Sequence, residues 1–193
     1  TDEMLRLLNR IDVNSGETYL VKGGVPHAIG SGCLIVEIQE PTDYTVRVER
    51  VTPSGFNIAD SMCHQGLGFQ TMFECFDYVG MSLQAVREAY CKKPEEKKWE
   101  FGRRRKLIGY GDTPWLQIEQ LDVGSSCQFK GDGLFSCLYV LSGQGILKSK
   151  TQEYTLKRND QFFIPAASLA YSITCSDESP ISILLMRGPE TVR

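Results

Sequence analysis

Histidine is scarce in this 193-residue sequence, which holds only His27 and His64, and the formal net charge is only -3. Acidic and basic residues are interspersed, so the chain lacks the strong field that attracts nucleic acid or a membrane surface. It also lacks any run near the ~20 apolar residues of a membrane span, and its first segment, TDEMLRLLNR, lacks the order of a secretion signal. We therefore expect a cytoplasmic protein with no nucleic-acid or membrane partner, which acts on a small molecule or binds another protein.

The seven cysteines include no C-x-x-C pair, the spacing typical of structural zinc sites and redox motifs. Their number is odd, and most lie in apolar runs such as GSGCLIVEI, FECFDYV and FSCLYVL. A reduced thiol in such a run behaves as a small hydrophobic side chain. We expect no disulfide framework and no metal site built from the thiols.

Short β-branched and aromatic runs separated by Gly, Pro and Asp fill residues 11–51, as in TYLVKGG, CLIVEIQ and YTVRVERV. The same pattern returns from Trp115, in WLQIEQLDV, SCLYVLSGQGILKS and ISILLMRG. Short strands at this spacing predict a sandwich or barrel. The two parts also resemble each other, since GETYLVKGGVPHAIG aligns with RNDQFFIPAASLAYSIT and places His27 on Ala170. The sequence thus predicts two related β-barrel units, of which only the first keeps an imidazole.

Residues 52–114, between these parts, have a different pattern. Turn signals and the glycine-rich HQGLGF precede MSLQAVREAYCKK, where Ser82 could cap a short helix. The charged tract KKPEEKKWEFGRRRK follows, and we expect it to be a solvated connection between two folded parts. Its four consecutive cations, residues 103–106, could instead hold a sugar phosphate, because guanidinium groups suit phosphate oxygens.

His27 follows two glycines and a Val-Pro pair at the entrance of a predicted strand. In a jelly-roll barrel such a turn aims the next side chain into the barrel mouth. A neutral imidazole in that position is a good zinc ligand. The alternative interpretation is a ring whose nitrogen is satisfied by a backbone carbonyl group.

Glu37 lies in the apolar run LIVEIQ, and a carboxylate is rarely buried in such a strand without a partner. Arg47, ten residues further on in the alternating run TVRVERV, is the candidate partner. One interpretation is a salt bridge that joins two strands. The other is a site with one metal ligand, one carboxylate and one cation, a set that suits proton transfer beside a carbonyl group.

The segment GVPHAIGSGCLIVEIQEPTDYTVRVER resembles a turn and two strands of the class I mannose-6-phosphate isomerases, which are zinc enzymes of the cupin superfamily. Their pattern is a Gly-x-Pro-His-Ala turn, a Glu-x-Gln strand and a Ser/Thr-Asp-x-Thr-x-Arg strand. HQGLGFQTMFECFDY resembles a later part of these enzymes more loosely, and the stretch from LYVLSGQGIL to DQFFIPAAS is similar to their metal-free C-terminal cupin. The resemblance implies a mostly β chain of cupin (RmlC-like jelly-roll) barrels. Residues 1–51 would be part of a zinc-type barrel, residues 52–114 a loop and helix connection, and residues 115–193 a complete metal-free barrel.

Position by position, the resemblance makes His27 a zinc ligand, Arg47 the residue that stabilises an enediol-type intermediate, and Glu37 a carboxylate with a part in proton transfer. The implied reaction is the interconversion of mannose 6-phosphate and fructose 6-phosphate. The family's other zinc ligands come from an upstream region with a Q-x-H-P pattern, which this sequence lacks. We therefore expect the C-terminal portion of an isomerase, inactive as an isolated chain, with zinc absent or weakly held.

Two other functions stay open on the sequence alone. One is a non-catalytic carbohydrate-binding or assembly module of the cupin type, and the other is a homodimer that covers exposed strand edges. In the second barrel, Ala170 stands where metal-binding cupins place a histidine. Tyr171, Gln161 and Tyr154 are polar enough to line a small-ligand pocket there, although on a β surface such residues more often serve packing.

Overall fold

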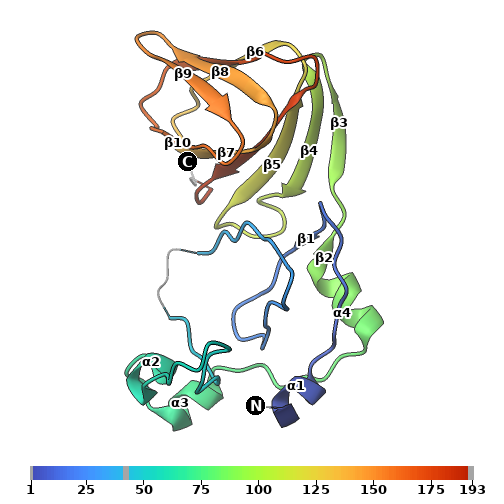
Figure 1. Cartoon of the computed structure of the whole chain (residues 1–193), viewed down its shortest axis with the longest axis vertical. Coiled ribbons are helices and arrows are strands. Elements are labelled where there is room, and N and C mark those ends of the chain that lie inside the picture. Colours follow the sequence, from blue (N-terminus) through green and yellow to red (C-terminus); the bar gives the residue numbers. More distant parts are fainter. Residues whose placement is uncertain (1, 41–43, 191–193) are drawn as a thin grey trace. The chain divides into compact units, whose positions relative to one another are not determined.

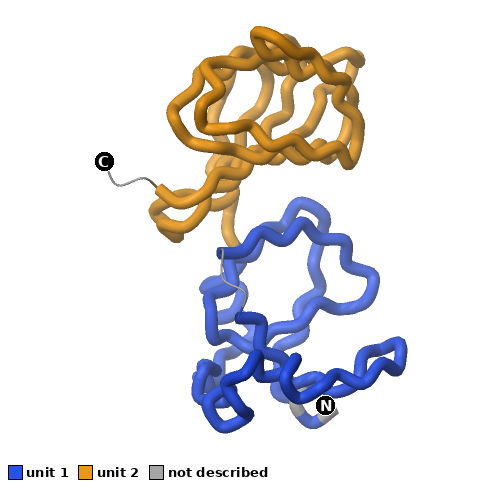
Figure 2. The backbone as a smooth tube through the Cα atoms, turned by 90° about the vertical axis from the view of Figure 1, so that its left-hand side faces the viewer, with its two compact units in different colours: residues 1–91 blue, residues 92–193 orange. Residues whose placement is uncertain are grey.

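The computed structural model describes residues 2–40 and 44–190. The chain divides into two compact units, residues 1–91 and 92–193, which are coloured separately in Figure 2. The first unit consists mainly of loops and short helices, whereas the second is built from strands (Figure 1). The extended sheets therefore lie in the second unit.

The helices of the first unit are all short. Its elements are α1 (Asp2–Leu7), β1 (Thr18–Tyr19), α2 (Asp60–His64), α3 (Phe69–Glu74) and α4 (Leu83–Tyr90), and β1 pairs with β2 (Cys91–Lys92) where the unit ends. The helix predicted after Ser82 is confirmed as α4. The Ser82 hydroxyl oxygen accepts a hydrogen bond from the Ala85 amide at 3.2 Å, which satisfies one of the free amides at the helix start.

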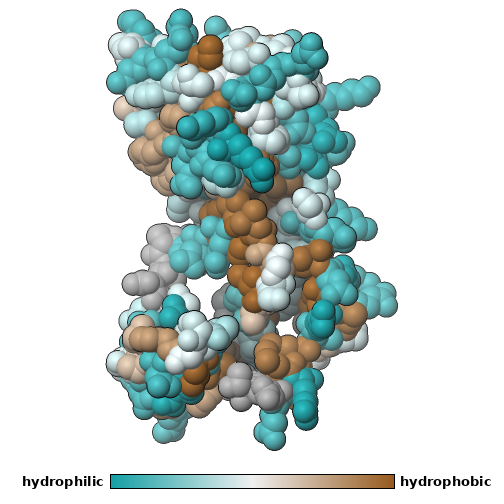
Figure 3. Space-filling model, in the orientation of Figure 1, coloured by the Kyte–Doolittle hydropathy of each residue, from teal (hydrophilic) through white to brown (hydrophobic). Residues whose placement is uncertain are grey.

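The strands predicted at CLIVEIQ and YTVRVERV are wrong for the residues that the structure describes, because residues 33–40 and 44–50 contain no strand. Part of the stretch between them, residues 41–43, lies outside the described residues. The apolar side chains of Leu34 (91% exposed), Ile35 and Val36 are open to solvent. Figure 3 shows apolar side chains on the surface of this unit. A strand needs a hydrogen-bonded neighbour, and the described part of this unit pairs only β1 with β2 and one isolated bridge.

The second unit consists of two antiparallel sheets. The strand order is β10-β7-β12-β5-β4-β3 in the larger sheet and β6-β11-β8-β9 in the smaller one. The strand bounds are β3 (Glu95–Trp99), β4 (Gly102–Ile108), β5 (Gln117–Val123), β6 (Ser126–Lys130), β7 (Ser136–Ser142), β8 (Gln144–Ser149), β9 (Glu153–Lys157), β10 (Gln161–Ile164), β11 (Ala170–Cys175) and β12 (Ile181–Arg187). Non-consecutive strands lie side by side, as in a jelly roll. The predicted mostly β fold class is confirmed.

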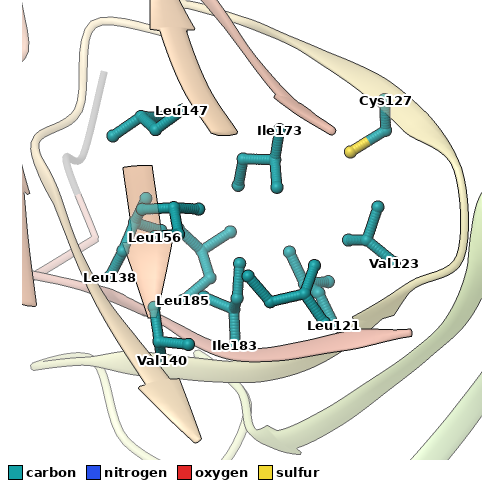
Figure 4. Packing of buried hydrophobic residues seen from close by; sticks show 11 residues of the cluster. Leu121, Val123, Cys127, Leu138, Val140, Leu147, Leu156, Ile173, Ile183 and Leu185 are labelled. Carbon is teal, nitrogen blue, oxygen red and sulfur yellow. The ribbon is translucent and has the colours of Figure 1, made fainter. Parts of the chain in front are cut away.

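One apolar core fills the space between the two sheets (Figure 4). Strand alternation sends every second side chain inward, and Ile183 of β12 pairs with Leu121 of β5 and Val140 of β7 on the inward face. Burying each such side chain contributes roughly 1.5–3 kcal/mol. Cys127 belongs to the same core, and burial raises the pKa of its thiol to about 11. That thiol therefore stays protonated and unreactive at neutral pH.

The charged tract after α4 is not the solvated connection that its composition predicts. Residues 95–99 and 102–108 form β3 and β4, an antiparallel hairpin on the edge of the larger sheet. The division between the two compact units falls between residues 91 and 92, so the segment 92–114 belongs to the second unit. Glu95 and Glu96 of β3 face Lys106 and Arg105 of β4 across the ladder, and Trp99 packs against the core. The lysines of β3 face Arg103 and Arg104, whose charges are balanced by carboxylates of β5.

Candidate functional site

A tight turn positions His27. Gly24 has φ +83°, and a Cβ atom at this residue would lie 3.0 Å from the Cys75 carbonyl oxygen. Glycine is therefore required there. The Gly24 carbonyl oxygen also accepts a hydrogen bond from the Asp77 amide at 2.7 Å, which ties the turn to the segment after α3. The turn that precedes the His27 ring is therefore fixed by the conformation of Gly24 and by this hydrogen bond.

The His27 ring is exposed, and its Nδ1 lies 2.8 Å from the carbonyl oxygen of Val25. A carbonyl oxygen only accepts, so Nδ1 carries the proton and donates it. This contact matches the interpretation of a histidine satisfied by the backbone. It also leaves the lone pair of Nε2 free, the arrangement found in histidines that bind a metal.

Glu37 and Arg47, the other two residues predicted for the site, are both exposed. Glu37 does not lie in a buried strand, so the expectation of a buried carboxylate is wrong. The Arg47 amide donates a hydrogen bond to the Cys63 carbonyl oxygen at 2.9 Å, which anchors its backbone to the end of α2. Among the described residues no ion pair joins Glu37 to Arg47. Both side chains are thus free to contact another group.

Within residues 2–40 and 44–190, no group of three histidines, cysteines or carboxylates is close enough to hold a metal ion. A zinc site takes about three protein ligands or more, so His27 and its described surroundings do not fit zinc by themselves. The second histidine does not replace the missing ligands. The Nδ1 of His64 accepts a hydrogen bond from the Gly66 amide at 3.2 Å, and its ring meets Phe69 edge-on at 5.1 Å.

The cationic run 103–106 is occupied by ion pairs within the second unit. Arg103 pairs with Asp122, Arg104 with Glu119, Arg105 with Asp122, and Lys106 with Glu95. The Lys106 ammonium group lowers the pKa of Glu95, and Glu95 in turn raises the pKa of Lys106. The run therefore stabilises the β3–β4–β5 ladder, and it offers a sugar phosphate few unpaired cations.

A cavity of about 340 Å³ lies beside the β3–β4 hairpin in the second unit. Its lining includes three lysines and two carboxylates, namely Lys92, Lys93, Lys106, Glu95 and Asp112. The ammonium group of Lys92 donates a hydrogen bond to Asp112 at 2.8 Å. This bond has the largest effect, and a hydrogen bond from the Gly109 amide the second largest, in holding the pKa of Asp112 below its ordinary value. Two of the three lysines are thus already neutralised by a carboxylate.

The polar residues suggested for a pocket in the second barrel lie on different elements. Tyr171 stacks on Phe129 at a centroid distance of 4.9 Å, and burial raises the pKa of its hydroxyl group. Gln161 is exposed on β10. The Tyr154 hydroxyl donates to Gln152 Oε1 at 2.7 Å. These interactions are those of packing residues with a solvated end.

Comparisons with known proteins relate this chain to one group of enzymes. Residues 116–179 match the family model described as "Mannose-6-phosphate isomerase, cupin domain". The Bacillus subtilis protein YvyI, which carries a provisional mannose-6-phosphate isomerase name, is 25% identical over 174 residues, or 88% of this chain and 50% of its own. The mannose-6-phosphate isomerase of Streptococcus mutans is 24% identical over 161 residues, or 82% of this chain and 46% of its own. The chain spans about half the length of the curated relatives it matches.

Among solved structures, the chain is similar to the mannose 6-phosphate isomerase from Bacillus subtilis, with a TM-score of 0.49 and 14% sequence identity. That likeness covers 72% of this chain and 38% of the other. Among the helices that the structure describes, none is long and apolar enough to span a membrane.

The second unit has two antiparallel sheets over one apolar core, which is a cupin-like jelly-roll fold, and residues 116–179 of it are similar to a cupin-domain model. The cupin that this chain resembles is that of the mannose-6-phosphate isomerases. The similarity extends over most of the chain and confirms the resemblance predicted from the sequence.

Proposed function

We propose that this chain is the C-terminal portion of a zinc-dependent, cytoplasmic aldose–ketose isomerase that interconverts mannose 6-phosphate and fructose 6-phosphate. The observation that carries the proposal is the match of residues 116–179 to the isomerase cupin domain. Identity of 24% to the Streptococcus mutans isomerase over 82% of this chain supports it. Because the chain covers about half of each relative, the activity in this proposal belongs to a longer protein.

Isomerisation of this kind moves a proton between C1 and C2 of the open-chain sugar, while negative charge develops on the carbonyl oxygen. The carboxylate of Glu37 is assigned the proton transfer. The guanidinium group of Arg47 is assigned the stabilisation of the developing oxyanion. Both side chains are exposed, which leaves them accessible to a sugar phosphate.

Zinc, when bound, polarises the sugar's carbonyl oxygen. His27 is assigned as one zinc ligand, because Nδ1 is engaged by the carbonyl oxygen of Val25 and Nε2 is the nitrogen that the neutral ring would offer a metal. The described residues add no group of ligands around it. The proposal therefore holds that the isolated chain binds zinc weakly or not at all, and that it is inactive.

The experiment compares this chain with the complete product of the gene that encodes it. Bound zinc is measured by mass spectrometry, and isomerase activity is measured with mannose 6-phosphate. The complete protein is expected to hold zinc and to be active, and His27→Ala in it is expected to remove both properties. His64→Ala is the matched control and is expected to keep them, since the His64 ring packs against Phe69.

Zinc binding by the complete protein without any turnover of mannose 6-phosphate contradicts the isomerase. Binding of mannose 6-phosphate without turnover supports the alternative, a carbohydrate-binding cupin module. Full activity in His27→Ala removes the assignment of His27 but leaves the isomerase in place. The three results are distinct, so the reaction and the ligand are tested separately.

A further inference from the structure

The two sheets of the second unit end in four edge strands, β10 and β3 in the larger sheet and β6 and β9 in the smaller. An edge strand presents unpaired backbone amide and carbonyl groups, and natural proteins commonly protect such edges with charged side chains. Strands β3 (EEKKW), β6 (SCQFK) and β9 (EYTLK) each carry at least one lysine. Strand β10 (QFFI) carries no charge at all. Among the four edge strands of these two sheets, it is the one without a charged residue.

An aromatic pair lies beside this edge. Phe163 of β10 is 62% exposed, and its ring packs on Phe135, which is 41% exposed, with a centroid distance of 5.7 Å and an interplanar angle of 30°. The Phe135 ring lies so close to Gly188 that a Cβ atom there would be 2.3 Å from Phe135 Cζ. Glycine at position 188 thus makes room for the ring. An exposed apolar pair next to an unpaired edge is the combination that strand addition uses.

We propose that β10 is the docking edge for a second copy of this chain, whose own β10 pairs with it in antiparallel fashion. The two-fold axis is perpendicular to the sheet and passes midway between the two Phe163 residues. This axis maps the outward face of one sheet onto the outward face of the other. The two Phe163 rings then face each other, and Phe162 faces Ile164 of the second copy on the inward side.

The occupant is a second copy because the strand is complementary to itself. In such a pairing the central residue always meets its own counterpart. At β10 that contact is between two apolar rings, and such aromatic pairs stabilise an interface beyond the area that they bury. At β3 the same axis would place a lysine or a glutamate against its own kind along residues 95–98, and like charges directly opposite each other are destabilising. Strands β6 and β9 carry no exposed phenylalanine.

The contact is small, since β10 has only four residues. Interfaces below about 1,200 Å² belong to transient complexes. The dimer is therefore expected to form reversibly, with a dissociation constant on the order of 10–100 µM. This inference depends on the sheet edge alone and is independent of the isomerase proposal.

Sedimentation of this chain from about 5 to about 500 µM tests the inference, a range chosen to bracket the expected affinity. The mass of the native chain is expected to rise toward twice the 21.7 kDa of one copy. Phe163→Glu places two carboxylates face to face and is expected to keep the chain monomeric. Gln128→Glu adds the same charge to the edge strand β6 and is expected to behave like the native chain.

A native chain that stays monomeric over the whole range overturns the proposal, and so does a Phe163→Glu chain that still dimerises. Circular dichroism of both variants confirms that each is folded. The register has its own test, because a cysteine at position 163 would face its counterpart across the axis. Under mild oxidation by diamide, Phe163→Cys is expected to give a covalent dimer above the level of the native chain, whose exposed Cys33 and Cys75 set the background. Equal cross-linking of Phe163→Cys and Gln128→Cys overturns the register.

Discussion

The guanidinium group of Arg104 binds the carboxylate of Glu119 through two hydrogen bonds, from Nε to Oε1 at 2.9 Å and from Nη2 to Oε2 at 2.6 Å. Glu119 is only 5% exposed, and strand alternation places it on the same inward face of β5 as Leu121 and Val123. A carboxylate so close to an apolar core is costly unless it is paired. The planar fork of arginine matches the two carboxylate oxygens.

Removing one partner of this pair should destabilise the second unit. Arg104→Met leaves the Glu119 carboxylate buried without its cation, which costs about 3–5 kcal/mol for a fully buried pair. Since the Arg104 side chain is 37% exposed, we expect about 2 kcal/mol after allowing for solvent screening. The free energy of unfolding in urea is the measurement.

The double variant Arg104→Met/Glu119→Leu separates the lost pair from the lost packing. Two apolar side chains are expected to recover most of the stability, because no buried charge remains. Lys97→Ala on β3 is the control, and it is expected to change stability by less than about 0.5 kcal/mol. A double variant as unstable as Arg104→Met would contradict the explanation.

Asp122 makes stability depend on pH. Burial opposes its ionisation, but hydrogen bonds from Ser182, Arg103 and Gln120 outweigh burial and hold the pKa of Asp122 below its ordinary value. The folded state therefore gains stability above the ordinary pKa, and it loses that stability as the pH falls through the lowered pKa. Asp122→Asn is expected to cost about 1–2 kcal/mol at pH 7.

That cost should shrink as the pH falls from the ordinary pKa of an aspartate toward the lowered pKa of Asp122, because the unfolded chain takes up the proton first. Urea unfolding at several pH values measures the difference between the two proteins. Asp177→Asn is the matched control on an exposed carboxylate. A cost that stays constant down to pH 2 would show that Asp122 stabilises the fold by shape and not by charge.

Gly143 is required for two separate reasons. Its φ is +81°, and a Cβ atom would lie 2.8 Å from the Cα atom of Ile181 and 3.0 Å from the Pro180 carbonyl oxygen. Gly133 has a similar φ of +79° but nothing within 4 Å of a Cβ atom. Gly133→Ala thus measures the backbone penalty alone, about 1–2 kcal/mol.

Gly143→Ala adds a steric conflict with backbone atoms, and overpacking of this kind costs roughly 1–3 kcal/mol more. We expect a total of about 3 kcal/mol. Thermal and urea unfolding of the two variants side by side give the difference. Equal costs at the two positions would mean that the β7–β8 turn moves away from Ile181 without loss.

The second unit could be predicted well from its sequence because every strand finds its partner within the unit. In β5 the apolar Leu121 and Val123 alternate with polar residues, which marks them as inward, and the ladder joins Leu121 directly to Ile183 of β12. A match between local pattern and pairing partner is what makes such a prediction reliable.

The β3–β4 hairpin was missed because charged residues have low strand propensity and look solvated in isolation. Part of the signal was present in the pairing of Glu95 and Glu96 with Lys106 and Arg105, which becomes visible only when the two segments are considered as a pair. The opposite error occurred at Leu34 to Val36, where a strong β pattern forms no strand in the structure. Propensity cannot supply a pairing partner, so the pattern alone could not show that Glu37 would be exposed.

Arg47 offers the sharpest test of the proposed site. Arg47→Lys in the complete enzyme keeps the charge but removes the planar fork. If Arg47 stabilises the oxyanion, kcat should fall by roughly 100-fold or more. Stability should change by less than about 0.5 kcal/mol, because the side chain is exposed and makes no ion pair among the described residues.

Arg50→Lys is the matched control for this test, since Arg50 lies three residues further along the chain and pairs with Asp60 instead. It is expected to keep kcat while losing a little stability. A fall in stability without a fall in kcat for Arg47→Lys would mean that the Arg47 side chain stabilises the fold of this segment and does not act on the oxyanion. Equal falls in kcat for both variants would show that the activity responds to the fold of this segment, so that no catalytic role would follow for Arg47.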